Sequence, residues 1–270
     1  MPKPYAIPLS PRGLSNIAPP PPWHYSGDCL IVEFWADVAA VAAILPAGLA
    51  MDPNSAGHAV AMFVDWQFTG ENDELLEPAR YQYREFLLLV DAVYDTQPVA
   101  YCPYIFVDND SSLMRGLIQG FPKRLGAIHQ TRTFAASSPA SAIVKPGARF
   151  AATASTAGQR IARAEVTLTA KLDDPSKLSL TSRPLVNLRH FPRLAAGQHD
   201  KPAVHELVMS VMDNANFADA WAGDGQLSLP VVDGEEISDL APVRVGPGYR
   251  VSMSYTVTDL KTLLDKTQAG

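Results

Sequence analysis

Apolar and polar positions alternate along much of the chain, and such alternation is typical of β-strands with one buried face. The clearest case is 163–170, where apolar or small residues are separated by Glu and Thr. Apolar runs at 29–34, 59–68, 81–93 and 99–107 contain many β-branched and aromatic residues. These runs predict strands that are buried more deeply.

The second half of the chain continues this pattern. Residues 149–156 and 160–172 predict a hairpin. Strand character resumes at 129–134 and returns in a last strand at 249–257, and apolar periodicity is present at 202–212 and 226–232.

Three helices are predicted among these strands. Asp37 is a suitable N-cap for a helix over 38–45 that Pro46 ends. Asp110-Ser111-Ser112 predicts the cap of a short helix through residue 118, and Pro122 prevents its continuation. A C-terminal helix is predicted over 259–266.

Residues 1–22 contain eight prolines and predict an extended N-terminal arm, because proline fixes φ and lacks an N–H. Such an arm would wrap the body of the protein or a neighbouring subunit. Residues 23–258 have no internal repeat and no shift in composition. We therefore expect an arm over 1–22 and one domain over 23–270, of the α+β class and rich in β-structure.

Composition excludes several functional classes. The chain has 270 residues, of which 47% are apolar, and a net charge of −6, which argues against nucleic acid as a partner. No apolar run is long enough for a membrane span, and the N-terminus does not resemble a signal peptide. These features predict a cytoplasmic protein, with Cys29 and Cys102 as buried reduced thiols.

Metal and phosphate chemistry is not expected either. The six histidines lack the spacing of metal ligands, so we expect no metal. Glycine-rich phosphate loops and a Gly-x-Ser-x-Gly motif are also absent from the sequence.

Lys123 is the candidate nucleophile of the chain. It lies in Gly-Phe-Pro-Lys-Arg-Leu-Gly, between Pro122 and Arg124. A lysine needs a lowered pKa to attack a carbonyl, and burial and a neighbouring cation both lower it. Phe121 and Leu125 can supply the burial and Arg124 the charge. The segment therefore predicts an amine that forms Schiff bases, although Pro-Lys-Arg is also a common surface turn.

The segment 113–126 resembles the active-site segment of the acetoacetate decarboxylase family, which has Gly-Arg-Glu, then an aromatic residue, Pro, Lys-Lys and Leu-Gly. Lys123 falls on the lysine that forms the imine, and Arg124 falls on the second lysine. Tyr83-Arg84-Glu85 resembles an upstream Tyr-x-Glu, and 219–223 a downstream Ala-Trp-x-Gly.

The resemblance covers nearly the whole chain. It implies a cone- or barrel-like β architecture with a central cavity, few short helices and homo-oligomers. It also implies a covalent lysine imine in place of a separate cofactor.

Glu85 is the acid/base candidate, because the family carries an active-site glutamate there. On a strand, Tyr83 and Glu85 share one face. The alternative is that Glu85 forms a structural ion pair with Arg115 or Arg84, and the sequence leaves both interpretations open.

Three departures from the family pattern bear on the reaction. Family decarboxylases carry an arginine near Ser26-Gly27-Asp28 that binds the substrate carboxylate, and a second glutamate in the region that 58–61 covers. The glutamate of Gly-Arg-Glu is Gly116 here. This pattern is more similar to family members that condense pyruvate with an aldehyde and dehydrate the aldol.

The resulting hypothesis is a Schiff-base lyase acting on a small 2-oxo acid, with an aldehyde as co-substrate. Lys123, Glu85 and Tyr255 are the candidate catalytic residues, with Tyr249 as an alternative acid. Gln119, Tyr83, Arg124 and Arg115 are the candidate substrate-binding residues. Decarboxylation of acetoacetate or another β-keto acid is the second hypothesis. A non-catalytic small-molecule binding protein is the third.

Overall fold

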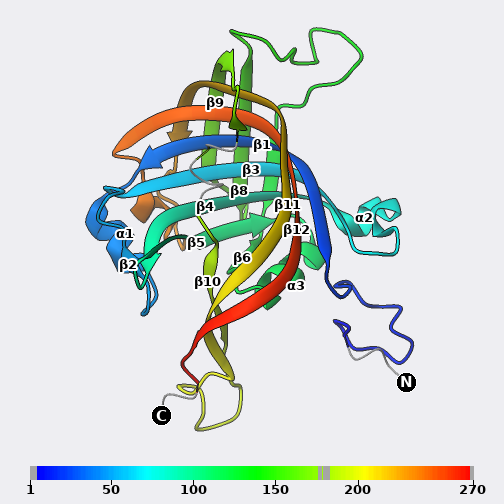
Figure 1. Cartoon of the computed structure of the whole chain (residues 1–270), viewed down its shortest axis with the longest axis vertical. Coiled ribbons are helices and arrows are strands. Elements are labelled where there is room, and N and C mark those ends of the chain that lie inside the picture. The colour runs from blue at the N-terminus through cyan, green and yellow to red at the C-terminus, as the bar shows by residue number, and fades with distance from the viewer. Residues whose placement is uncertain (1–4, 176–177, 179–182, 268–270) are drawn as a thin grey trace.

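The computed structural model describes residues 5–175, 178 and 183–267 (Figure 1). The described strands form one large sheet with few short helices. The strands are β1 (Trp23–Trp35), β2 (Ala50–Met51), β3 (His58–Thr69), β4 (Gln82–Tyr94), β5 (Gln97–Val107), β6 (Lys123–Leu125), β7 (Ala127–Gln130), β8 (Arg149–Thr156), β9 (Gln159–Lys171), β10 (Val186–Phe191), β11 (Val204–Ser228) and β12 (Arg244–Asp265).

The helices are α1 (Val38–Ile44), α2 (Pro78–Tyr81) and α3 (Asp110–Ile118), with the 3₁₀ turns η1 (Glu74–Leu76) and η4 (Ile237–Leu240). Asp37 caps α1 as the sequence predicts, because its side chain accepts from the backbone N–H groups of Ala39 and Ala40. The cap of α3 is Asn109, whose side chain accepts from the Ser112 N–H. The expected cap at 110–112 is therefore one residue too late.

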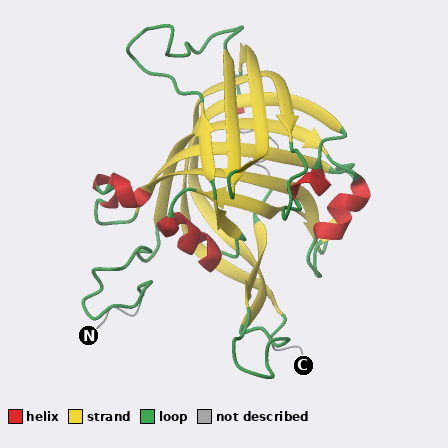
Figure 2. Cartoon of the chain, turned by 180° about the vertical axis from the view of Figure 1, so that it is seen from behind, coloured by secondary structure: helices red, strands yellow, loops and turns green. Residues whose placement is uncertain are grey.

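The strand order is β6-β5-β4-β3-β1-β12-β11-β9-β8-β7, with β10 pairing β11 and β2 pairing β4. Neighbours are antiparallel except β5 and β6. The sheet curls strongly on itself (Figures 1 and 2). This β-rich single domain confirms the expected fold class.

The curled sheet buries apolar side chains on both faces. Along β1, Leu30, Val32 and Phe34 belong to one core cluster, which also holds Phe150 and other residues of the β8–β9 hairpin. Cys29 belongs to a second cluster on the opposite face. The site described below lies on the side of this second cluster.

The predicted C-terminal helix over 259–266 is wrong. β12 continues through Asp265 and pairs with β11, with Leu260 opposite Ser210 and Leu264 opposite Leu207. The periodic segments 202–212 and 226–232 both overlap one long strand, β11. The first segment contains its start at Val204, and the second contains its end at Ser228. The strand expected at 129–134 is shorter, since β7 ends at Gln130.

The long strands β11 and β12 continue past the body of the sheet and form, with β10, a projecting ribbon (Figure 1). The described part of the N-terminal arm has no helix or strand. It contacts the body of the protein at α3, where the Ser111 hydroxyl donates to the Ile17 carbonyl at 2.6 Å. Among the described residues, no helix combines the length and apolar character that crossing a bilayer requires.

Candidate active site

The junction between α3 and β6 positions Lys123. The chain turns at Gly120, whose φ of 84° suits glycine. The Phe121 N–H then bonds the Gly116 carbonyl at 2.9 Å. β6 begins at Lys123 and pairs in parallel with β5, opposite Ile105. Lys123 therefore lies at the start of a strand, just past the turn that follows α3.

Gly116 makes room for the stem of Lys123. A Cβ at Gly116 would lie 2.2 Å from Lys123 Cδ and 2.4 Å from its Cε. Both distances are far below van der Waals contact. Gly116, where the resemblance places a glutamate, therefore provides the space through which the lysine reaches the interior.

The Lys123 amine is buried and has two polar contacts. Nζ donates to Glu85 Oε2 at 2.6 Å and to Ser112 Oγ at 2.9 Å, and the side chain is only 7% exposed. The other carboxylate oxygen of Glu85 accepts from Trp66 Nε1 at 3.1 Å. Glu85 thus lies between a fixed indole donor and the lysine.

Neither Arg84 nor Arg115, the two partners that the sequence suggests for Glu85, forms an ion pair with it among the described contacts. Arg84 lies near Asp65 and Asp108, at 3.9 and 3.8 Å. The ion pair that Glu85 forms is with Lys123. The carboxylate is therefore next to the proposed nucleophile, where an acid/base group is needed.

The pKa of Lys123 is lowered from its ordinary value. Burial lowers this pKa most, the Glu85 carboxylate raises it, and the Arg115 guanidinium lowers it again. The predicted direction is therefore matched, but the cation that acts is Arg115. The Arg124 side chain is 55% exposed and pairs with Glu235 at 2.6 Å, because neighbours on a strand point to opposite faces.

Arg115 is almost fully buried in the second turn of α3, with its guanidinium 3.6 Å from the centroid of the Phe68 ring. Its Nη1 donates to Ser111 Oγ at 2.5 Å, while Nε and Nη2 have no hydrogen-bond partner within the described part of the chain. A buried guanidinium with free donors is suited to an anionic partner.

A small cavity of about 30 Å³ lies beside Lys123. Its lining includes five of the residues predicted from sequence: Tyr83, Glu85, Gln119, Lys123 and Tyr255. The other lining residues are Tyr25, Ile105, Phe121, Leu185, Ser210, Met212 and Val257. Arg115 and Arg124 do not line it, nor does Tyr249, whose pKa burial and the nearby Glu33 raise to about 12.

Three phenols surround the lysine. Tyr25 and Tyr255 face each other across β1 and β12, with stacked rings whose centroids are 5.0 Å apart. The Tyr83 ring centroid lies 5.4 Å from Lys123 Nζ. Burial raises the pKa of all three, so each hydroxyl keeps its proton near neutral pH. Such hydroxyls can donate hydrogen bonds to a substrate oxygen.

Sequence reasoning missed Ser112, Tyr25, Trp66 and Ser210. The position of Ser112 is partly encoded locally, because residues 112, 116 and 119 share one face of α3. The other three come from β1, β3 and β11 and depend on how distant strands pair. No local pattern identifies them.

Asp28, in the region where the resemblance places an arginine, lies on the opposite face of β1 from Tyr25, which lines the lysine cavity. Its carboxylate accepts from Ser252 and from Arg250, the latter at 3.3 Å. Gly27, on the inner side, would place a Cβ 2.6 Å from the Trp66 ring. Trp66 therefore fills the space on this side of β1.

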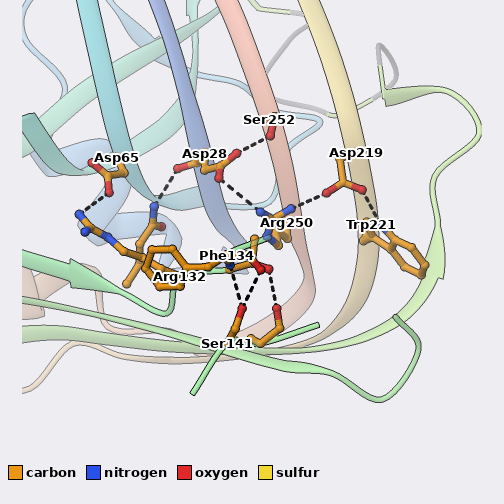
Figure 3. A network of polar contacts seen from close by, with 12 residues as sticks. Asp28, Asp65, Arg132, Phe134, Ser141, Asp219, Trp221, Arg250 and Ser252 are labelled. Atoms are coloured by element: carbon orange, nitrogen blue, oxygen red, sulfur yellow. Dashed lines mark hydrogen bonds and ion pairs between the residues drawn. The ribbon is translucent and has the colours of Figure 1, made fainter. Parts of the chain in front are cut away.

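The Ala-Trp-x-Gly segment also belongs to this outer network. Trp221 Nε1 donates to Asp219 at 3.0 Å, and Arg250 donates to the other oxygen of Asp219 at 2.8 Å (Figure 3). The segment thus lies at a polar cluster outside the lysine cavity. Across residues 5–175, 178 and 183–267, no group of three or more His, Cys, Asp or Glu is arranged to hold a metal ion.

Comparison with known proteins gives a consistent result. A family model described as Acetoacetate decarboxylase (ADC) matches residues 5–267. The enduracididine biosynthesis enzyme MppR, solved in complex with the condensation product of pyruvate and imidazole 4-carboxaldehyde, is 35% identical with a TM-score of 0.89, covering 97% of each chain. MppR has also been solved in complex with pyruvate.

Two further structures are similar to the chain. An acetoacetate decarboxylase-like enzyme from Sphingomonas wittichii is 27% identical with a TM-score of 0.85, over 95% of this chain and 98% of that one. An acetoacetate decarboxylase from Legionella pneumophila shares the fold at 20% identity and a TM-score of 0.76, over 95% and 92%. No curated protein matches the chain significantly.

Proposed function

The chain belongs to the acetoacetate decarboxylase family, and we propose that it is a Schiff-base lyase that condenses a small 2-oxo acid such as pyruvate with an aldehyde and dehydrates the product. The observation that carries the proposal is the buried Lys123 amine, 2.6 Å from Glu85 and with a lowered pKa. MppR, a similar structure, binds the condensation product of pyruvate and an aldehyde.

Imine formation is the first step. Lys123 transfers a proton to Glu85 and attacks C2 of the oxo acid, and the carbonyl oxygen leaves as water. The protonated imine withdraws electrons from the neighbouring methyl group. Glu85, again a carboxylate, removes a methyl proton and gives the enamine.

Condensation and dehydration follow. The enamine carbon attacks the aldehyde, and a neighbouring acid protonates the new alkoxide. Tyr255 is our candidate for this acid, because burial keeps its hydroxyl protonated and it lines the cavity. Loss of the hydroxyl as water and hydrolysis of the imine release a 2-oxo alkenoic acid.

Binding of the oxo-acid carboxylate is assigned to Arg115 and Gln119. Gln119 lines the cavity, and its Oε1 lies 3.5 Å from Ser210 Oγ. Arg115 lies behind the cavity wall with two free donors, so it attracts the carboxylate through its charge. Tyr83 lines the cavity, and the centroid of its ring lies 5.7 Å from the Arg115 guanidinium carbon.

Decarboxylation of a β-keto acid remains the second candidate function. It is less favoured because family decarboxylases carry a substrate-binding arginine in this region. The residues here are Gly27 and Asp28, which offer no cation to the cavity. A non-catalytic binding protein is the third candidate and predicts no covalent adduct. The homo-oligomer, the cytoplasmic location and the boundary between the arm and the domain at residue 23 remain predictions from sequence.

The test is intact mass spectrometry after incubation with pyruvate, or separately with acetoacetate, and borohydride. We expect a reduced pyruvate adduct that is lost in Lys123→Ala. An ultraviolet-absorbing unsaturated oxo acid formed after addition of an aldehyde would support the lyase, whereas release of carbon dioxide from acetoacetate would support the decarboxylase. Absence of an adduct with either substrate would contradict the assignment of Lys123.

A further inference from the structure

Ser112 is the second hydrogen-bond partner of the Lys123 amine, and the mechanism above gives it no role. Its Oγ lies 2.9 Å from Nζ, and the residue is fully buried. Its backbone N–H is held by the Asn109 side chain at 2.9 Å. The hydroxyl is therefore fixed in the first turn of α3 and does not depend on a bound substrate for its position.

Counting protons at the lysine nitrogen shows why a second acceptor matters. The ammonium carries three protons, and two of them leave with the carbonyl oxygen as water when the imine forms. One proton remains on the imine nitrogen and needs an acceptor in a buried site. Within the described part of the chain, Glu85 and Ser112 accept hydrogen bonds from Nζ in the resting site.

Glu85 cannot serve both purposes well. If its Oε2 accepts the imine N–H, that oxygen is engaged at the moment when a base is required at the methyl carbon. Its other oxygen already accepts from Trp66. If another residue accepted the imine N–H, Oε2 of Glu85 would be free to act as the base.

We propose that Ser112 accepts the imine N–H of Lys123, so that Glu85 is released to remove the methyl proton of the bound oxo acid. This inference rests on the proposed Schiff-base function and assigns Ser112 to one step of it. The step is balanced: the methyl carbon loses a proton to Glu85, the C–H electron pair forms the enamine double bond, and the imine nitrogen becomes neutral while keeping its single proton.

Two measurements separate this role from a merely structural one. The first is the rate at which borohydride traps the pyruvate adduct, which reports imine formation. The second is exchange of the pyruvate methyl protons in D₂O, followed by proton NMR, which reports enamine formation. Loss of packing would lower both rates together, whereas loss of the imine acceptor lowers exchange more than trapping.

The variants are Ser112→Ala, which removes the acceptor, and Ser112→Cys, which keeps a similar volume but offers a weak acceptor. Ser141→Ala is the control, because Ser141 is also a buried serine but bonds Phe134, away from the lysine cavity (Figure 3). For both Ser112 variants we expect trapping within about tenfold of the unaltered protein and exchange lowered about 100-fold. Ser141→Ala should keep both rates.

The outcomes distinguish the two proposals. If the unaltered protein gives neither adduct nor exchange, the Schiff-base function itself is wrong, and the role of Ser112 with it. If the unaltered protein shows both but the Ser112 variants exchange at the normal rate, or lose trapping and exchange equally, the Schiff-base function stands and the role of Ser112 is overturned.

Discussion

Gly116→Ala is the sharpest test of how the position of the Lys123 side chain depends on the space at Gly116. The added Cβ would lie 2.2 Å from Lys123 Cδ, while ordinary contact begins at 3.4 Å. The lysine stem must therefore move by about 1.2 Å, the difference between these two distances. Because Nζ is held at one end by Glu85 and Ser112, the shift breaks at least one of these contacts.

A displacement of about 1 Å can lower a reaction rate about 100-fold when geometry is decisive. We therefore expect Gly116→Ala to form the borohydride-trapped pyruvate adduct about 100 times more slowly. Unfolding is not expected to be the cause, since alanine is favoured over glycine in a helix by about 1 kcal/mol. Thermal melting of the same sample checks this point.

Gly70→Ala is a matched control for the same substitution. The atoms nearest to its added Cβ would be those of the Glu74 carboxylate, from 3.1 Å, and Glu74 lies at the start of the 3₁₀ turn η1, away from Lys123. The control should form the adduct at the normal rate. A Gly116→Ala protein that melts normally and forms the adduct as fast as the unaltered chain would refute the proposed seating of Lys123.

The remaining predictions concern charge. Arg115→Met should move the pH midpoint of adduct formation upward, because the Arg115 cation lowers the pKa of Lys123; Arg124→Ala should leave it unchanged, and an equal shift in both variants would contradict this. His58 donates to Asp91 at 3.0 Å, and although burial lowers its pKa, Asp91 and Glu33 raise it to about 9. Its contribution to stability is full below about pH 6.5 and is lost as the pH rises through about 9. The urea midpoint of unfolding should therefore fall as the pH rises across that range, and the fall should be smaller in His58→Gln. An equal fall in His58→Gln would contradict the role of His58.

The strands were largely predictable because alternation and β-branched runs report burial on one or both faces. The segment 259–266 was not, since its leucines fit one face of a helix as well as alternate positions of a strand. Pairing of Leu264 with Leu207 on β11 decides between the two. That pairing joins residues far apart in sequence, so no local pattern could reveal it.

The candidate site was predictable in part for a similar reason. Lys123 and Glu85 follow from a motif, and their separation of 2.6 Å agrees with it. Arg124 was the natural choice for the neighbouring cation because it is adjacent in sequence, yet adjacent strand residues point apart. The cation that influences the lysine, Arg115, reaches it from the helix before the turn.

The small size of the lysine cavity has a consequence for the chemistry of the resting protein. The cavity has a volume of only about 30 Å³, and Glu85 and Ser112 already occupy the hydrogen-bonding positions of the amine, so a sugar or free aldehyde must displace these contacts before it reaches the nitrogen. Burial therefore protects Lys123 from the indiscriminate glycation that consumes exposed lysines. If Lys123 is the nucleophile that we propose, the same burial that lowers its pKa also preserves the amine between substrates.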